Sequence, residues 1–121
     1  MLDNWYLFNR DVYVGILTYN EESKKFSFRK ENEGKLVDEA IKLLNLDRDS
    51  DAIWFMLEDR CFPPDRVNAR ELLDELNLIE YDKWSILKKT HLCDYNDNIW
   101  MSKEKDGSQF FKINPRGIAG L

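Results

Sequence analysis

Two arginines stand six residues apart around a proline-rich bend at residues 60–66, "RCFPPDR". Pro63 and Pro64 lack an amide hydrogen and end the helix expected before them, so the bend is stiff. Guanidinium groups bind carboxylates and phosphates through a planar fork of donors. The spacing therefore predicts one of two chemistries. Either an internal Arg–Asp clamp ties the bend to the rest of the fold, or two fixed cations receive a partner protein or an anionic ligand.

The two arginines differ in their helical positions. Arg60 ends one predicted helix, where a positive charge is favourable by about 0.3–1 kcal/mol. Arg66 opens the next helix, where a cation is mildly unfavourable, so we expect it to have a specific partner. The nearest loop carboxylates are Asp94 and Asp97, in "CDYNDNIWM". We interpret the pattern first as an Arg–Asp clamp to the last strands, and keep as the alternative an anion clamp by Arg60 and Arg66, with Asp97 as base.

Other patterns that could carry chemistry are weak. His91 is the only histidine, and Cys93 lies two residues from it, a spacing that seldom orients two side chains for proton transfer, so we interpret His91 as a capping or packing residue. A metal site would need Cys61, His91, Cys93 and Asp94 to converge. The five glycines form no phosphate-binding loop. We expect no catalytic set, no metal and no cofactor.

Composition limits the class of protein. The chain has 121 residues, 43% of them hydrophobic and 13% aromatic, enough for one domain with one core. The net charge is −5, and residues 49–101 alone carry 6 basic and 12 acidic side chains. Because nucleic-acid binding requires clustered Lys and Arg, this charge disfavours it and disfavours a helix-turn-helix at residues 66–91.

The start of the chain and its cysteine content bear on location. Residues 1–11 lack the basic start and apolar run of a signal peptide, and no stretch reaches the length of a membrane span. Cys61 and Cys93 form no CxxC motif. We expect a cytoplasmic protein with two free thiols.

Hydrophobic periodicity predicts strands in the first quarter of the chain. Residues 12–19 alternate with β-branched and aromatic side chains, and residues 24–30 place Phe26 and Phe28 on one face. The polar "NEES" between them predicts a turn, and hence a β-hairpin. The preceding "WYLFN" predicts a third strand, because an isolated hairpin is marginal in water.

Helical periodicity follows, and then shorter apolar runs. We predict helices at about 35–46, 51–60, 66–77 and 81–91, with Asp49 or Ser50 capping the second. The second is apolar nearly all round and so central to the core, and in the third we expect Val67 to face inward with its leucines. Short strands are predicted at about 98–102 and at "FFKI". The fold class is therefore α+β, one domain over 1–113, with a tail at 114–121.

The order of these features resembles the N-terminal portion of HipA-like serine/threonine kinases of the Gram-positive type. The likeness covers about residues 10–102: Trp54, an R-x-x-P-x-x-R bend made by Arg60, Pro63 and Arg66, the stretches "ELLDELNL" and "ILKKTHLCDYNDNIWM", and a D-x-x-W entry into the last strand. That entry adds Asp97 and Trp100 to the candidate binding residues. Leu92 stands where such motifs often have glycine, which leaves the conformation of that loop open.

The resemblance implies a regulatory role and no activity of its own. The chain shows no H-R-D or D-F-G motif and stops at Leu121, before any kinase lobe. We expect a non-enzymatic interaction module, the small subunit that restrains a HipA-like kinase in a toxin–antitoxin or mobile-element operon. A second copy of the chain is the other protein partner considered. The alternatives from other classes are a small anion- or nucleotide-binding protein and a small enzyme.

Overall fold

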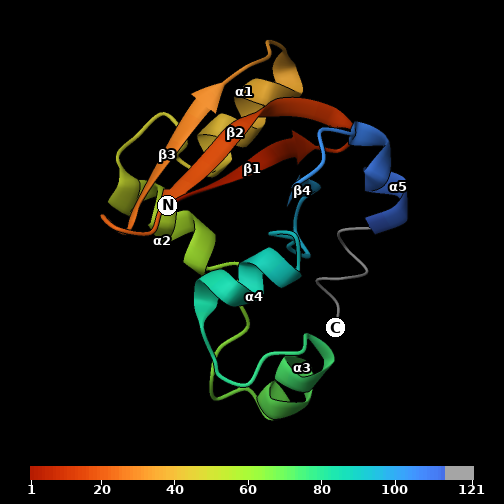
Figure 1. Ribbon diagram of the computed structural model, residues 1–121. Coiled ribbons are helices and arrows are strands. Elements are labelled where there is room, and N and C mark those ends of the chain that lie inside the picture. Colours follow the sequence, from red (N-terminus) through yellow and green to blue (C-terminus); the bar gives the residue numbers. More distant parts are fainter. Residues whose placement is uncertain (114–121) are drawn as a thin grey trace.

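Alternating side chains in the first thirty residues build three antiparallel strands, as predicted, in the computed structural model, which describes residues 1–113 (Figure 1). Asn20 closes the "NEES" turn, because its side-chain oxygen accepts from the amides of Glu22 and Ser23. A fourth strand from the C-terminal part pairs with the first, giving the order β3-β2-β1-β4. The strands are β1 (Leu2–Asn9), β2 (Val12–Asn20), β3 (Lys25–Lys30) and β4 (Ile99–Ser102).

Four helices lie between β3 and β4 in the chain, so the α+β class is confirmed. Each is shorter than its periodicity predicts, by up to five residues. The helices are α1 (Lys35–Leu43), α2 (Ser50–Glu58), α3 (Ala69–Glu75) and α4 (Lys83–Lys89). The predicted cap is present, since the Asp49 side chain accepts from the Ala52 amide 2.9 Å away.

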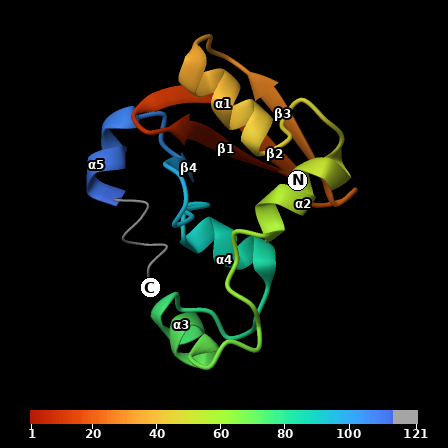
Figure 2. The ribbon, with the colours of Figure 1, turned by 180° about the vertical axis from the view of Figure 1, so that it is seen from behind.

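The helices cover one face of the sheet and extend beyond it. In two opposite views, α1 and α2 lie against the sheet, α4 follows, and α3 is at the end of the molecule away from the strands (Figure 1, Figure 2). The main core fills the space between this face and the helices, and includes Leu7, Leu17, Val37, Ile53 and Leu87. A smaller cluster on the opposite face contains Phe8, Cys93 and Trp100.

Three helices end in the same way, and this explains why their C-terminal ends come earlier than predicted. Asn45, Asn77 and His91 each adopt a left-handed backbone with φ between 55° and 59°. The amide of the following leucine then bonds back to a carbonyl in the last turn, at 2.9 Å for α1 and at 2.8 Å for α3 and α4. This is the Schellman arrangement, in which a left-handed residue stops the helix and an apolar residue follows it.

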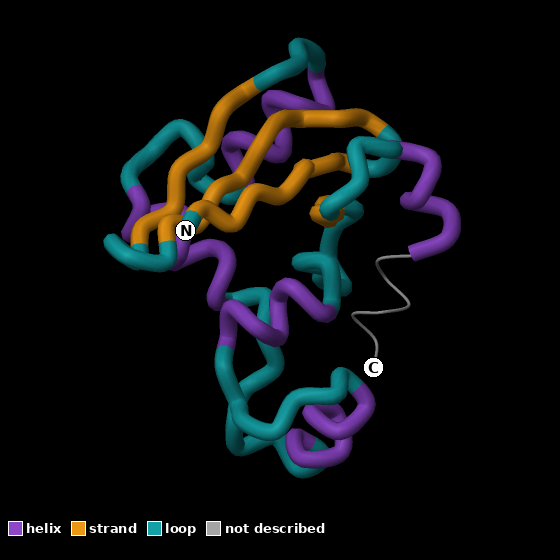
Figure 3. Tube along the Cα trace, in the orientation of Figure 1, coloured by secondary structure: helices purple, strands orange, loops and turns teal. Residues whose placement is uncertain are grey.

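Three expectations about the elements are wrong. "FFKI" is not a strand: Asp106 caps a 3₁₀ turn at Gly107–Gln109, and this turn continues as the helix α5 (Phe110–Ile113), visible in Figure 3. Val67 is fully exposed, because α3 begins only at Ala69 and Val67 belongs to the preceding turn. Helix α2 is not buried all round, since Phe55 is 68% exposed. The predicted tail at 114–121 lies outside the described residues.

Candidate functional site

Arg60 is the centre of an internal clamp. Its Nη1 and Nη2 donate to the two carboxylate oxygens of Asp97 at 2.7 and 2.8 Å, in a bidentate pair. Its Nε also donates to the Leu92 carbonyl at 2.6 Å, and its Nη2 to the Ile99 carbonyl at 3.1 Å. The side chain of Arg60 is only 4% exposed. The clamp therefore joins the end of α2 to the end of α4 and to the start of β4.

This geometry limits what else Arg60 can do. Four of its hydrogen bonds go to protein oxygens, and the Asp94 carboxylate lies 4.0 Å from Nη1. An anionic ligand would have to displace Asp97 from a buried pair, which costs several kcal/mol. The observed contacts therefore match the internal clamp considered for this bend, and they give the anion clamp no support at Arg60.

Arg66 and Trp100 occupy different parts of the molecule. Arg66 is exposed in the turn before α3, and it lines a cavity of about 190 Å³ together with Arg60, Cys61 and Cys93. Trp100 is fully buried on the far face of the sheet, where its ring stacks on Phe8 at 4.3 Å. Its indole NH donates to the Arg10 carbonyl at 2.6 Å. The four residues considered for binding thus do not share one surface, and their binding role stays a prediction.

The thiols and His91 have structural contacts. Burial raises the pKa of both Cys61 and Cys93 to about 12, so both thiols stay protonated at neutral pH. His91 contacts β4 twice. Its carbonyl accepts from the Met101 amide at 2.9 Å, and its Nδ1 lies 3.0 Å from the Met101 carbonyl. Among residues 1–113, no three His, Cys, Asp or Glu side chains gather as a metal site would require.

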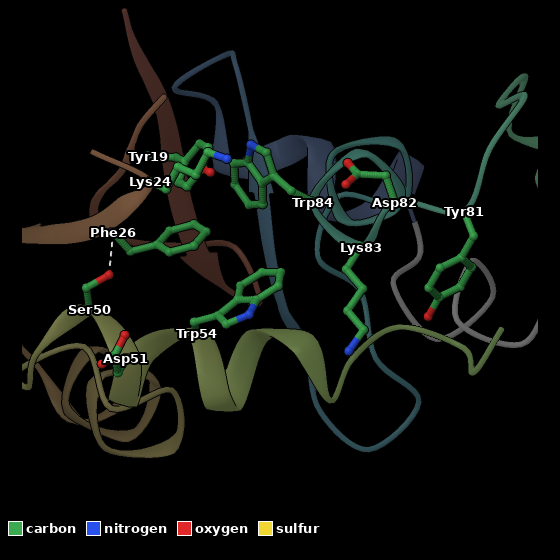
Figure 4. Close-up of a pocket in the computed structure, with 10 residues that line it drawn as sticks. All are labelled: Tyr19, Lys24, Phe26, Ser50, Asp51, Trp54, Tyr81, Asp82, Lys83 and Trp84. Atoms are coloured by element: carbon green, nitrogen blue, oxygen red, sulfur yellow. Dashed lines mark hydrogen bonds between the residues drawn. The ribbon is translucent and has the colours of Figure 1, made fainter. Parts of the chain in front are cut away.

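A second cleft has aromatic walls. It has a volume of about 500 Å³ and opens between the β2–β3 hairpin, α2 and the start of α4 (Figure 4). Tyr19, Trp54 and Trp84 are partly exposed in it, while Phe26 is buried behind them. Phe26 stacks on Trp54 at 5.4 Å between ring centroids and meets Trp84 edge-on at 5.1 Å. Three elements therefore hold these rings around one opening.

The sequence positions explain why the rings meet. Tyr19 and Phe26 are directly paired across the hairpin, on its helix-facing side. Ser50 fixes the start of α2 to the same strand, because its hydroxyl accepts from the Phe26 amide at 2.7 Å. That anchor brings Trp54, one helical turn further on, over the Phe26 ring.

Charged side chains of both signs lie around the cleft. Asp51, Trp54 and Glu58 stand at i, i+3 and i+7 on α2 and so share one side of the helix. Lys83 enters from α4 and pairs with Glu58 at 3.1 Å. Asp82 caps α4 by accepting from the amide and hydroxyl of Ser85, hydrogen bonds that hold the pKa of its carboxyl below the usual value. Lys24, on the hairpin, also lines the opening.

Sequence reasoning did not identify this cleft. Tyr19, Trp54 and Trp84 were assigned to strand and helix positions without a shared surface, because periodicity does not show which distant rings meet. One local signal was present: the Asp51–Trp54–Glu58 spacing puts an indole between two carboxylates, which a purely core-facing tryptophan would not require.

Comparison of the chain with family models, with curated proteins and with solved structures gives no match. The likeness to HipA-like kinases therefore stays a prediction from the order of residues. Within residues 1–113, no helix is both long enough and apolar enough to cross a bilayer.

Proposed function

We propose that this protein is a non-enzymatic interaction module that binds another protein through the aromatic cleft. The observation that carries the proposal is the set of three partly exposed rings, Tyr19, Trp54 and Trp84, around one opening of about 500 Å³. Tryptophan and tyrosine dominate the binding energy of protein interfaces because they bury a large area at a small cost in side-chain entropy.

The scaffold behind the rings favours recognition. Phe26 supports Trp54 from one face, and Tyr19 packs against Phe26 at 4.7 Å, so the rings are held before a partner arrives. A preordered surface loses less conformational entropy on binding than a mobile one. The two thiols have raised pKa values, the reverse of what a thiol nucleophile needs, and this also favours a binding role.

The resemblance to HipA-like kinases indicates which partner to test first. Under this proposal the chain acts in the cytoplasm as the small subunit that restrains such a kinase, within a toxin–antitoxin or mobile-element operon. Trp54, one of the residues that carry the resemblance, is also a wall of the cleft. A kinase of this class encoded near the gene is the expected partner, and self-association is the competing outcome.

Co-purification with adjacent-residue variants tests the proposal. Trp54 and Phe55 are neighbours on α2, but Trp54 lines the cleft and Phe55 is 68% exposed outside its lining residues. Trp54→Ala should lose the partner recovered from host extract or from co-expression with the kinase, whereas Phe55→Ala should retain it. Thermal melts confirm that both variants are folded. Retention by Trp54→Ala, or loss by Phe55→Ala alone, contradicts the proposed surface.

A further inference from the structure

The charged groups around the aromatic cleft indicate what kind of side chain it accepts. Resting on the proposed function, we propose that the cleft binds an arginine side chain from a basic segment of the partner, stacked against the indole of Trp54 and paired with the carboxylate of Asp51. This assigns a ligand chemistry to the cleft that differs from the apolar anchor its aromatic walls alone would suggest.

Asp51, Trp54 and Glu58 on one side of α2, here called the carboxylate stripe, have the arrangement that a guanidinium requires. Asp51 lies one turn before Trp54 and Glu58 one turn after it, so a planar cation over the indole has a carboxylate within reach at either end. Glu58 is already paired with Lys83. The Asp51 carboxylate is exposed and makes no hydrogen bond or ion pair to any other residue within 1–113. One end of the stripe is therefore occupied and the other is open.

The molecule already uses this chemistry internally. The Lys83 ammonium enters the cleft side of α2 from a neighbouring helix and ends on Glu58 (Figure 4). The Lys88 ammonium lies 5.9 Å from the centre of the Trp84 ring. The indoles and carboxylates around the cleft thus already attract lysines of this chain. A cation from a partner would experience the same electrostatic attraction.

The remaining charges at the cleft are compatible with an incoming cation. Asp82 stays ionised as the cap of α4. The positive charge of Lys83 is offset by Glu58. Lys24 lines the rim on the hairpin side, away from Asp51 (Figure 4), and Lys88 lies over the Trp84 ring. Helix α2 carries Asp51 and Glu58 and no basic residue, so the field over this helix attracts basic segments and repels phosphates.

Arginine fits this site better than lysine. Its flat guanidinium stacks on an aromatic face, while its N–H donors point outward in the guanidinium plane and still reach a carboxylate beside the ring. A lysine ammonium is more strongly hydrated, so it loses more on entering the cleft. A nucleotide could also stack on the rings, but its phosphates would lie near Asp51 and Asp82 as well as near Lys24 and Lys83.

A matched set of peptides tests the inference. The probe is a synthetic peptide that alternates arginine and serine, and its control carries citrulline, which keeps the shape of arginine but has no charge. Tryptophan fluorescence and calorimetry follow binding at low and at physiological salt. We expect the citrulline peptide to bind at least about tenfold more weakly, and the affinity for the arginine peptide to fall as salt rises.

Two variants locate the binding. Asp51→Asn should weaken binding of the arginine peptide about fivefold, and Trp54→Leu about tenfold. Glu71→Gln removes an equal charge from α3, at the other end of the molecule, and should leave affinity unchanged. Since Asp51 is exposed, its variant tests the inference even if Trp54→Leu fails to fold.

Several results would overturn the inference. These are equal binding of the citrulline peptide, equal weakening by Glu71→Gln and Asp51→Asn, or no binding of the arginine peptide at all. An apolar peptide that binds better would reject the cationic ligand and leave the interaction module standing, because the Trp54 and Phe55 co-purification tests that module separately.

Discussion

At the scale of single residues, the proline-rich bend at residues 60–66 holds an internal clamp. Arg60 is buried and spends its donors on Asp97 and on two carbonyls, so the proline-stiffened turn positions a clamp. The sequence predicted an Arg–Asp pair in this region because one basic bend and one acidic loop were available. It could not tell which arginine is buried, since that depends on how α2 and β4 approach each other.

Removing the clamp should destabilise the fold strongly. Arg60→Gln leaves the Asp97 carboxylate largely buried without its bidentate partner, so the free energy of unfolding should fall by about 3 kcal/mol. Urea denaturation followed by circular dichroism measures this change. Arg70→Gln is the matched control, because Arg70 also bonds a carboxylate, Asp74, and two carbonyls, but on an exposed surface, where the loss should be smaller. Equal losses for the two variants would contradict the central role of the clamp.

The cap of α4 predicts a pH dependence. Hydrogen bonds from Ser85 lower the pKa of Asp82 in the folded state from its ordinary value of 3.8. Its stabilisation is therefore fully present above that value and is lost as the pH falls through the lowered pKa. Asp82→Ala should cost about 1 kcal/mol at neutral pH, and this cost should shrink in acid below the ordinary pKa. Asp47→Ala is the control, because it removes an exposed loop carboxylate that caps no helix.

At the scale of elements, strands and helices followed from periodicity, while the helix ends did not. The hairpin, the third strand and four helices were predictable, because alternation and helical spacing are local properties. The early ends of α1, α3 and α4 arise from left-handed residues followed by leucine. "Asn-Leu" at 45–46 and at 77–78 was the available signal, and its meaning was missed because leucine continues the helical pattern.

Asn77 tests the importance of these helix ends. Its φ of 59° suits glycine and asparagine and strains other residues. Asn77→Ala should lower the free energy of unfolding by about 1 kcal/mol, whereas Asn77→Gly should leave it equal or slightly higher. Asn68→Ala is the control, since the Asn68 side chain makes no capping bond and its φ is negative. Thermal or urea unfolding of the three variants distinguishes a conformational effect from a loss of contacts.

At the scale of the whole molecule, the two faces of the sheet and the aromatic cleft came from contacts between distant segments. The second helix was expected to be apolar nearly all round and Val67 to face inward, yet Phe55 and Val67 are exposed. The cleft is formed by a hairpin and two helices, and two of its rings, Tyr19 and Trp84, are sixty-five residues apart in the chain. Because the cleft depends on how the helices pack on the hairpin, the sequence alone predicts the elements that carry these rings but not that the rings meet.

Both thiols should react slowly in the native protein. Burial raises each pKa to about 12, and Cys93 is almost fully buried. Labelling by a thiol-specific disulfide reagent at pH 8 should therefore be slow in the native protein and rapid in urea. Single variants, Cys61→Ser and Cys93→Ser, assign the two rates. Rapid native labelling of Cys93 would contradict the packing described around Trp100.

The segment that carries α3 leaves the body of the protein and returns to the same place. The Tyr81 hydroxyl donates to the Phe62 carbonyl at 2.6 Å, and the Cys61 thiol lies 3.4 Å from the Lys83 carbonyl. Because its two ends are already joined, residues 63–80 can melt as a unit without separating α2 from α4. Amide hydrogens of α3 should then exchange with solvent well before those of β1 and β2. The free energy of global unfolding would therefore exceed the free energy needed to open the α3 segment alone.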